Sequence, residues 1–177
     1  MLLIRLAVHL QVCGKKSKNS YHSKMTLGID PGINIVGFAF VQGTRKKPEI
    51  IDFGILHTEQ QDRNHTHLRI LELAQDLESL IIKHKPTKAV IEDLFFFKNA
   101  KTVISVAQAR GMMLYLLAKH DVEIVSVTPL QVKQTLCGYG RATKKQIQAM
   151  VQKLYNLEVL PKQDDAADAL GMAWIGL

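Results

Sequence analysis

Apolar and polar residues follow one another in a regular order from residue 25 onward, and the spacing changes between strand-like and helix-like blocks. Short apolar runs rich in branched and aromatic residues, bounded by Pro, Gly or charged turns, are typical of strands. Such runs predict five strands, at residues 26–30, 33–41, 49–56, 88–93 and 123–127. Because only short turns separate the first three, we expect them to form an antiparallel meander.

Helical spacing of apolar residues predicts four helices between and after these strands, at residues 62–84, 99–119, 143–154 and from about 164 to the end. Thr143 and Gln146 have the spacing of a capping box, and Asp164 suits the N-cap of the last helix. The predicted buried stripe of the second helix passes through Val103, Val106, Ala107, Arg110, Leu114 and Leu117. We expect Arg110 and Gly111 to have a packing role there, with Gly111 permitting close approach.

Three strands followed by alternating helices and strands predict an α/β fold with a mixed five-stranded sheet flanked by helices. With 177 residues, of which 47% are hydrophobic, the chain fits one domain that needs no disulfides. We place this domain at residues 25–177. No apolar run reaches the ~18 uncharged residues of a membrane span, so we expect no membrane partner. Cys13 and Cys137 have no metal-like spacing, which favours a reducing cytoplasm.

Residues 1–24 differ from the rest, because they contain five basic residues and no acidic one. A secretory signal, an organelle transit peptide and an extension outside the folded domain are all compatible with this composition. Arg5 interrupts the apolar stretch, which disfavours the secretory signal. We favour the extension, with Met25 at the start of the domain.

Positive charge is concentrated in one part of the chain. The net charge is +7, but outside residues 1–24 there are 18 basic against 16 acidic residues. Residues 94–156 hold nine of these basic residues and only Asp121 and Glu123 as acids. A segregated basic region can neutralise nucleic-acid phosphates, although a solvated helix face would have the same composition.

Acidic residues stand at three positions where the predicted elements begin or end. Asp30 closes the first strand, Glu92 closes the fourth, and Asp165 and Asp168 lie on one face of the last helix. Taken singly, each suits a turn, a strand end or a helix N-terminus. If the two strands are neighbours and the helix packs across them, four carboxylates converge. Oxygen ligands of this kind favour Mg²⁺ or Mn²⁺, and two such ions about 4 Å apart can promote phosphodiester hydrolysis.

Five blocks together resemble the RuvC family of Holliday junction resolvases: GIDPG at 28–32, IEDLFFFKNA at 91–100, QARG at 108–111, PLQVKQTLCGYGRATKKQIQ at 129–148 and DAADAL at 165–170. Each block is weak alone, but their order and spacing are specific. The resemblance implies a ribonuclease-H-like fold, a homodimer and magnesium-dependent, symmetric nicking of four-way DNA junctions in recombination and repair. It further implies two Mg²⁺ ions per subunit, which Mn²⁺ can replace, and a branch-migration helicase complex as partner.

The same resemblance assigns roles to individual residues. Catalytic and metal-binding carboxylates fall on Asp30, Glu92, Asp165 and Asp168. Phe95 falls where an aromatic side chain inserts at the junction, and Lys133 and Lys144 fall on lysines that contact DNA. The chain departs from the family pattern by its first 24 residues and by extra acids beside the site, Asp93 and Asp164.

Three alternatives remain open. A junction-binding protein of the same fold without cleavage activity would not need the four carboxylates. Another nuclease of the ribonuclease-H fold would share them, but the lysines and Phe95 favour the junction enzyme. The segment TLGIDPGINIVGFAF at 26–40 also resembles the first phosphate loop of actin-like ATPases, which need two such domains and a longer chain.

Overall fold

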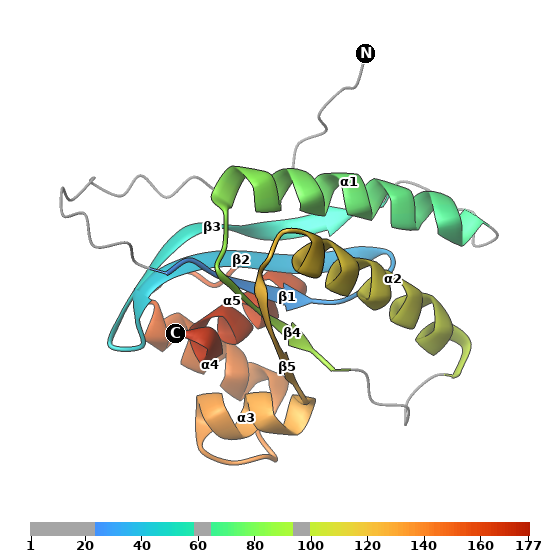
Figure 1. The fold of residues 1–177 in the computed structure, drawn as a ribbon. Helices are drawn as coiled ribbons and strands as arrows, with labels where there is room; N and C mark the ends of the chain where they lie inside the picture. Colours follow the sequence, from blue (N-terminus) through green and yellow to red (C-terminus); the bar gives the residue numbers. More distant parts are fainter. Residues whose placement is uncertain (1–23, 59–64, 94–99) are drawn as a thin grey trace.

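The computed structural model describes residues 24–58, 65–93 and 100–177, and the described part begins with three strands (Figure 1). The strands of the sheet are β1 (Thr26–Asp30), β2 (Ile35–Thr44), β3 (Lys47–His57), β4 (Lys88–Glu92) and β5 (Glu123–Val127). The helices are α1 (Thr66–His84), α2 (Ala100–Lys119), α3 (Pro129–Cys137), α4 (Lys144–Leu154) and α5 (Asp164–Gly176). Apart from Lys24, the predicted extension at 1–24 lies outside the described residues.

The five strands form one sheet in the order β3-β2-β1-β4-β5. The meander β1-β2-β3 is antiparallel, whereas β4 lies parallel to β1 and β5 parallel to β4. The mixed five-stranded sheet predicted from the order of elements is therefore confirmed. The parallel pairing has a direct consequence for the site, because it puts the carboxyl ends of β1 and β4 next to each other.

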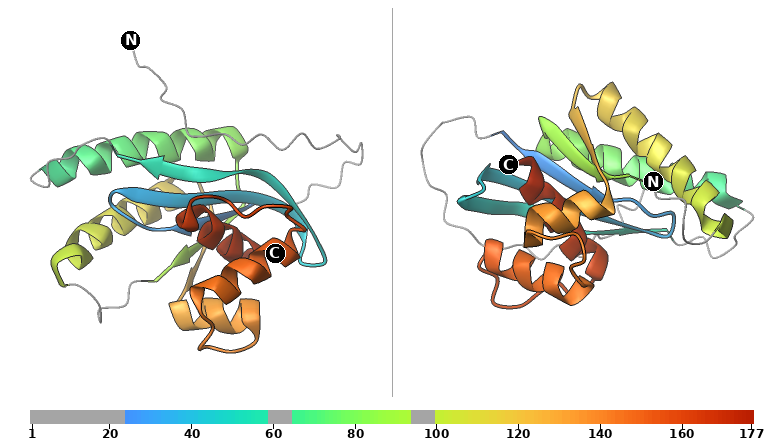
Figure 2. Two further views of the ribbon diagram at one scale, coloured as in Figure 1. Left: turned by 180° about the vertical axis from the view of Figure 1, so that it is seen from behind. Right: turned by 90° about the horizontal axis from the view of Figure 1, so that it is seen from below.

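Helices cover both faces of the sheet, and each face has its own hydrophobic core (Figures 1 and 2). On one face α1 and α2 pack against side chains such as Leu27, Phe38 and Ile91. On the other face α5 packs against side chains such as Ala39 and Val90, and α3 and α4 pack against α5. Alternation along each strand explains the division, since successive side chains point to opposite faces of a sheet.

Small residues allow α5 to approach the centre of the sheet. A Cβ atom on Gly28 of β1 would overlap the carbonyl oxygen of Ala169, and one on Gly37 of β2 would overlap the carbonyl oxygen of Asp165. Ala169 itself is fully buried. The helix backbone therefore lies directly on the two glycines, which fixes where α5 begins relative to the ends of β1 and β2.

Two helices differ from the prediction. The helix α3 was not predicted, although Thr128 and Gln131 form a capping box with Pro129 at the first helical position. In α2 the predicted stripe is right in part, because Leu117 is buried and Val106 and Leu114 pack against the core, whereas Ala107 is exposed. Ala109, Met113 and Leu116 are buried as well and were not predicted.

Gly111 also contradicts the prediction that it permits packing within the domain. It is exposed, and nothing lies within 4 Å of a Cβ atom built on it. Elsewhere the capping box of Thr143 and Gln146 at the start of α4 is confirmed. Over the three stretches that the structure describes, no helix has the length and apolar character of a membrane span.

Candidate active site

Asp30 and Glu92 end neighbouring parallel strands and lie on the same face of the sheet. Ile29 of β1 is paired with Ile91 of β4, so the next residue of each strand is one of the two acids. Val90, two residues before Glu92, belongs to the core under α5. Gly28, two residues before Asp30, contacts α5. Since side chains alternate with period two, both carboxyl groups belong to the α5 face.

The other two predicted carboxylates come from the first turns of α5. Asp30 is paired across the sheet with Gly37, and Gly37 lies against the main chain of Asp165. Asp168 follows Asp165 by three residues, which puts it on the same side of the helix. The structure thus brings together all four carboxylates that the sequence pointed to.

Burial and mutual repulsion raise the pKa values of three of these carboxyl groups, and burial is the larger cause. Burial, together with the negative charges of Asp168, Glu92 and Asp165, raises the pKa of Asp30 from its ordinary 3.8 to about 8. Burial and the charge of Asp168 raise the pKa of Glu92 to about 7, against the opposing effect of Lys133. Burial also raises the pKa of Asp168, while Lys144 opposes this shift. Burial is the largest cause of all three shifts, and the nearby lysines Lys133 and Lys144 offset them only in part.

Both lysines expected to contact DNA lie beside this cluster. Lys133 projects from α3 and is close enough to Glu92 to lower its pKa. The Lys144 ammonium, at the start of α4, lies 3.1 Å from an Asp164 carboxylate oxygen and 3.6 Å from one of Asp168. These positions put two cations at the rim of the acidic site, where a phosphate group could meet both.

Asp164 does not have the predicted capping role. The N-cap of α5 is Gln163, whose side chain makes no capping hydrogen bond, and Asp164 is the first helical residue. Its carboxylate accepts a hydrogen bond from Gln148 at 2.8 Å and pairs with Lys144. These contacts lower the pKa of Asp164. The extra acid therefore ties α4 to α5 rather than capping the helix.

The donor set fits a hard divalent cation in its chemistry. All four groups are carboxylates, the ligands that Mg²⁺ and Mn²⁺ accept, and Asp30 is buried beside the negative charges of the other three. In the described parts of the chain, no three His, Cys, Asp or Glu side chains are close enough together to hold a metal ion. The arrangement supplies the charge and the donors of a cation site but not its closed coordination geometry.

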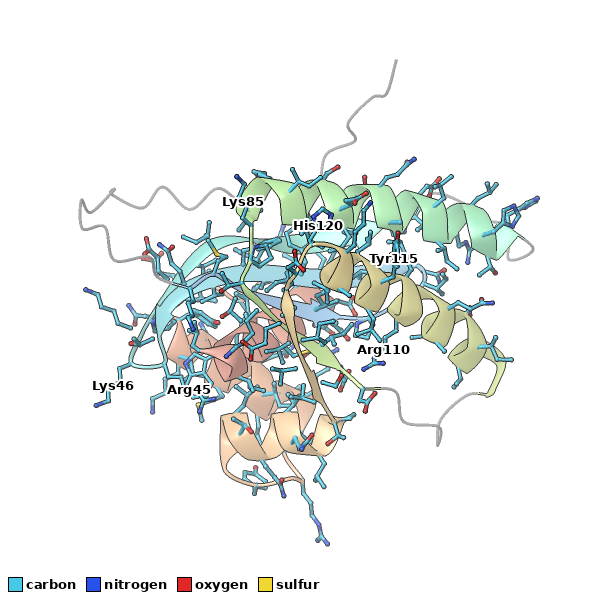
Figure 3. The ribbon with its side chains drawn as sticks, in the orientation of Figure 1. Arg45, Lys46, Lys85, Arg110, Tyr115 and His120 are labelled. Atoms are coloured by element: carbon cyan, nitrogen blue, oxygen red, sulfur yellow. The ribbon has the colours of Figure 1, made fainter. Side chains whose placement is uncertain are left out.

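Two further residues complete the account of the site. Phe95, expected to contact the junction, lies outside the described residues. Arg110 of α2 donates a hydrogen bond to the main-chain carbonyl of Glu92, a contact that sequence reasoning did not find (Figure 3). The spacing between these residues gives no signal for such a bond, since it depends on how α2 crosses the sheet.

The fold defines the class of protein. A sheet with this strand order, helices on both faces and acidic residues at the carboxyl ends of the central strands is typical of a ribonuclease-H-like domain. The family model described as crossover junction endodeoxyribonuclease RuvC matches residues 26–175, and the chain belongs to this family.

Individual relatives agree with this assignment. The crossover junction endodeoxyribonuclease RuvC of Fusobacterium nucleatum is 47% identical over 146 residues, which cover 82% of this chain and 76% of the relative. The protein of the same name from Alkaliphilus metalliredigens is 46% identical over 83% of this chain and 88% of its own. Among solved structures, Thermus thermophilus RuvC in complex with Holliday junction substrate superposes with a TM-score of 0.78 at 26% identity, over 85% of this chain and 91% of that one.

Proposed function

We propose that this protein is a magnesium-dependent endonuclease that resolves four-way DNA junctions by paired, symmetric nicks during recombination and repair. The observation that carries the proposal is the meeting of four carboxylates at the ends of β1 and β4 and the start of α5. Family membership supports the choice of substrate, because the solved Thermus thermophilus relative is described as bound to a Holliday junction.

Asp30, Glu92, Asp165 and Asp168 are the proposed catalytic residues and the proposed ligands of two Mg²⁺ ions, which Mn²⁺ can replace. When bound, such ions activate a water molecule and stabilise the leaving oxygen of a phosphodiester. The carboxylates would hold the ions, and burial would limit access of bulk water to the reacting phosphate. Asp30 is the central member, since all three other acids raise its pKa.

The helices α3 and α4 provide the proposed DNA-binding surface beside the acids. Between Pro129 and Leu157 the chain holds no acidic residue, and its basic residues are Lys133, Arg141, Lys144, Lys145 and Lys153. Such a surface attracts the DNA backbone at low salt and weakens as salt rises. We assign phosphate contacts to Lys133 and Lys144 because they also border the acidic site. Phe95 stays a prediction as a junction contact, since it lies outside the described residues.

A second copy of the chain is the proposed partner on the outer face of α2. Ile104 and Tyr115 on this helix are 70% and 63% exposed, and Gly111 between them leaves open space for another helix to approach. Figure 3 marks Tyr115 on α2. A two-fold symmetric dimer would present two acidic sites to the two strands that symmetric nicking requires.

Two further expectations rest on the sequence and the family alone. A branch-migration helicase complex is the expected partner in the cell, and the cysteine pattern favours the cytoplasm as the compartment.

The proposal is tested with end-labelled mobile four-way junctions and a linear duplex of the same sequence, each incubated with Mg²⁺ or with chelator. The wild-type protein should nick the junction symmetrically, only with Mg²⁺, and leave the duplex intact. Asp30→Asn should abolish nicking while junction binding persists, because it removes the central charge. Asp121→Asn is the matched control, since this exposed residue has a φ of 55°, which Asn tolerates.

Each alternative gives its own outcome. Junction binding by the wild-type protein without any nicks would support the silent junction-binding protein. Equal cutting of the duplex would support another nuclease of this fold. Nicking that survives in Asp30→Asn would contradict the assignment of the site.

A further inference from the structure

The guanidinium group of Arg110 joins three parts of the structure at the carboxyl end of β4 (Figure 3). Its Nε donates a hydrogen bond of 3.0 Å to the carbonyl oxygen of Glu92. One terminal nitrogen donates to the Ser126 hydroxyl of β5 at 2.9 Å and lies 3.0 Å from an Asp93 carboxylate oxygen. The Arg110 side chain, from the middle of α2, therefore contacts Glu92 at the end of β4, the following residue Asp93, and Ser126 of β5.

Arg110 makes these contacts at the end of β4, where Glu92 is paired with a neighbouring strand on one side only. The pairing of β4 with β1 ends at Ile91, one residue before Glu92. On the other side, Glu92 is paired with Val127 of β5, and the Asp93 amide donates to the Val127 carbonyl at 2.7 Å. The main chain of Glu92 is therefore held by its pairing with β5 and by Arg110.

The chemistry of arginine suits this position. Its planar group presents several N–H donors in fixed directions, so it can bind a carbonyl, a hydroxyl and a carboxylate at once. Only 15% of the Arg110 side chain is exposed, and charge-assisted hydrogen bonds in such a site are stronger than those on the surface. A lysine has one ammonium group and could not meet all three partners in the same geometry.

We propose that Arg110 is a positioning residue that fixes the Glu92 main chain, and with it the direction from which the Glu92 carboxylate enters the acidic site. The inference rests on the function proposed above, because it assigns Glu92 to that site. Arg110 acts through the peptide group rather than on the carboxylate, since its contact is with the Glu92 carbonyl. The loss of such a supporting residue typically lowers metal affinity or activity by about 10- to 100-fold.

The test compares the wild-type protein with Arg110→Ala, Arg110→Lys and Lys119→Ala. Lys119 is the matched control, because it lies on the same helix and is also paired with an acid, Glu78, at 2.8 Å. The first readout is amide hydrogen exchange at Asp93 by NMR, which needs neither metal nor DNA. We expect exchange at least about 10-fold faster in both Arg110 variants, with the amides of β1 unchanged, because the end of β4 opens locally.

The second readout is Mn²⁺ binding to the junction complex, followed by electron paramagnetic resonance. We expect the dissociation constant to rise about 10- to 100-fold in Arg110→Ala. Arg110→Lys should lie closer to Arg110→Ala than to the wild type, while Lys119→Ala should not change. Arg110→Lys keeps the positive charge, so it still provides the test if Arg110→Ala does not fold.

Unchanged Asp93 exchange in both variants would overturn the inference, and so would wild-type Mn²⁺ affinity with only a lower melting temperature. Wild-type behaviour of Arg110→Lys in both readouts would show that charge alone matters, which also contradicts it. A wild-type protein that neither binds Mn²⁺ nor cuts junctions would refute the proposed function instead, and Asp93 exchange would still decide the role of Arg110.

Discussion

Replacing Asp30 with Asn should stabilise the protein against unfolding when no divalent cation is present, although it should abolish cleavage. The pKa of Asp30 is raised from 3.8 to about 8 by burial and by three neighbouring carboxylates. Between these two values the folded state binds more protons than the unfolded state, so the stability of the folded protein falls as pH rises through this window. Asn has nearly the same shape and carries no charge, so the variant lacks this loss.

The magnitude follows from the shift. One pKa unit corresponds to about 1.4 kcal/mol, and the unfolded carboxyl group is ionised at both about pH 5.5 and about pH 8. The folded carboxyl group is protonated at the lower pH and about half ionised at the higher one. The wild-type protein should therefore lose about 3 kcal/mol relative to Asp30→Asn between the two pH values. Glu92 also titrates here, with a pKa of about 7, and the difference between the two proteins includes its repulsion with Asp30.

Urea unfolding of both proteins at these two pH values, with chelator present, measures the difference. Asp121→Asn is again the control, and it should follow the wild type at each pH. Added Mg²⁺ should stabilise the wild type selectively, by about 2.7 kcal/mol when its concentration is a hundredfold above the dissociation constant. Parallel stability profiles for wild type and Asp30→Asn would refute the reasoning, because they would show that ionising Asp30 has no cost in the folded protein.

Two further predictions concern packing and assembly. Gly37→Ala should destabilise the protein by at least about 1 to 3 kcal/mol in urea unfolding, because the added Cβ overlaps the Asp165 carbonyl oxygen. Unchanged stability would contradict the close approach of α5. Tyr115→Glu should halve the molar mass measured by light scattering, because it puts a charge on the proposed dimer face of α2. The control Leu71→Glu, on the exposed side of α1, should keep the molar mass of the wild type. An unchanged molar mass of Tyr115→Glu would contradict the proposed dimer face.

Strands were easier to predict from this sequence than helix faces. The runs at β1 and β5 agree with the structure at both ends, since each is a short apolar block with a clear boundary. In α2, by contrast, apolar residues occur on nearly every side, so the sequence alone separated the buried face from the exposed one only in part. The packing of α2 against α1 determines the buried face, which adds Ala109 and Met113 to the predicted Leu117.

The helix α3 was missed for a different reason. It has nine residues and buries only Val132 and Leu136, too few positions for helical spacing to be recognised. A local signal was nevertheless present, because Thr128, Pro129 and Gln131 form a capping box with Pro at the first helical position. The identity of the four carboxylates followed from strand ends and helix spacing. Their coupling and the tie from Arg110 did not, because both depend on tertiary packing.

The charges around the site distinguish a nuclease from a protein that only holds DNA. A binding surface gains affinity from cations facing phosphates, and α3 and α4 supply such cations. The four carboxylates beside this surface repel the same phosphates, and burial together with the other three acids raises the pKa of Asp30 at a cost to stability. Neither effect helps binding. Divalent cations, if the carboxylates hold them as proposed, would reverse both effects, because they would neutralise the carboxylates and attract a phosphate to the acidic site. An acidic cluster beside a basic surface therefore fits the proposed metal-dependent cleavage better than it fits DNA binding alone.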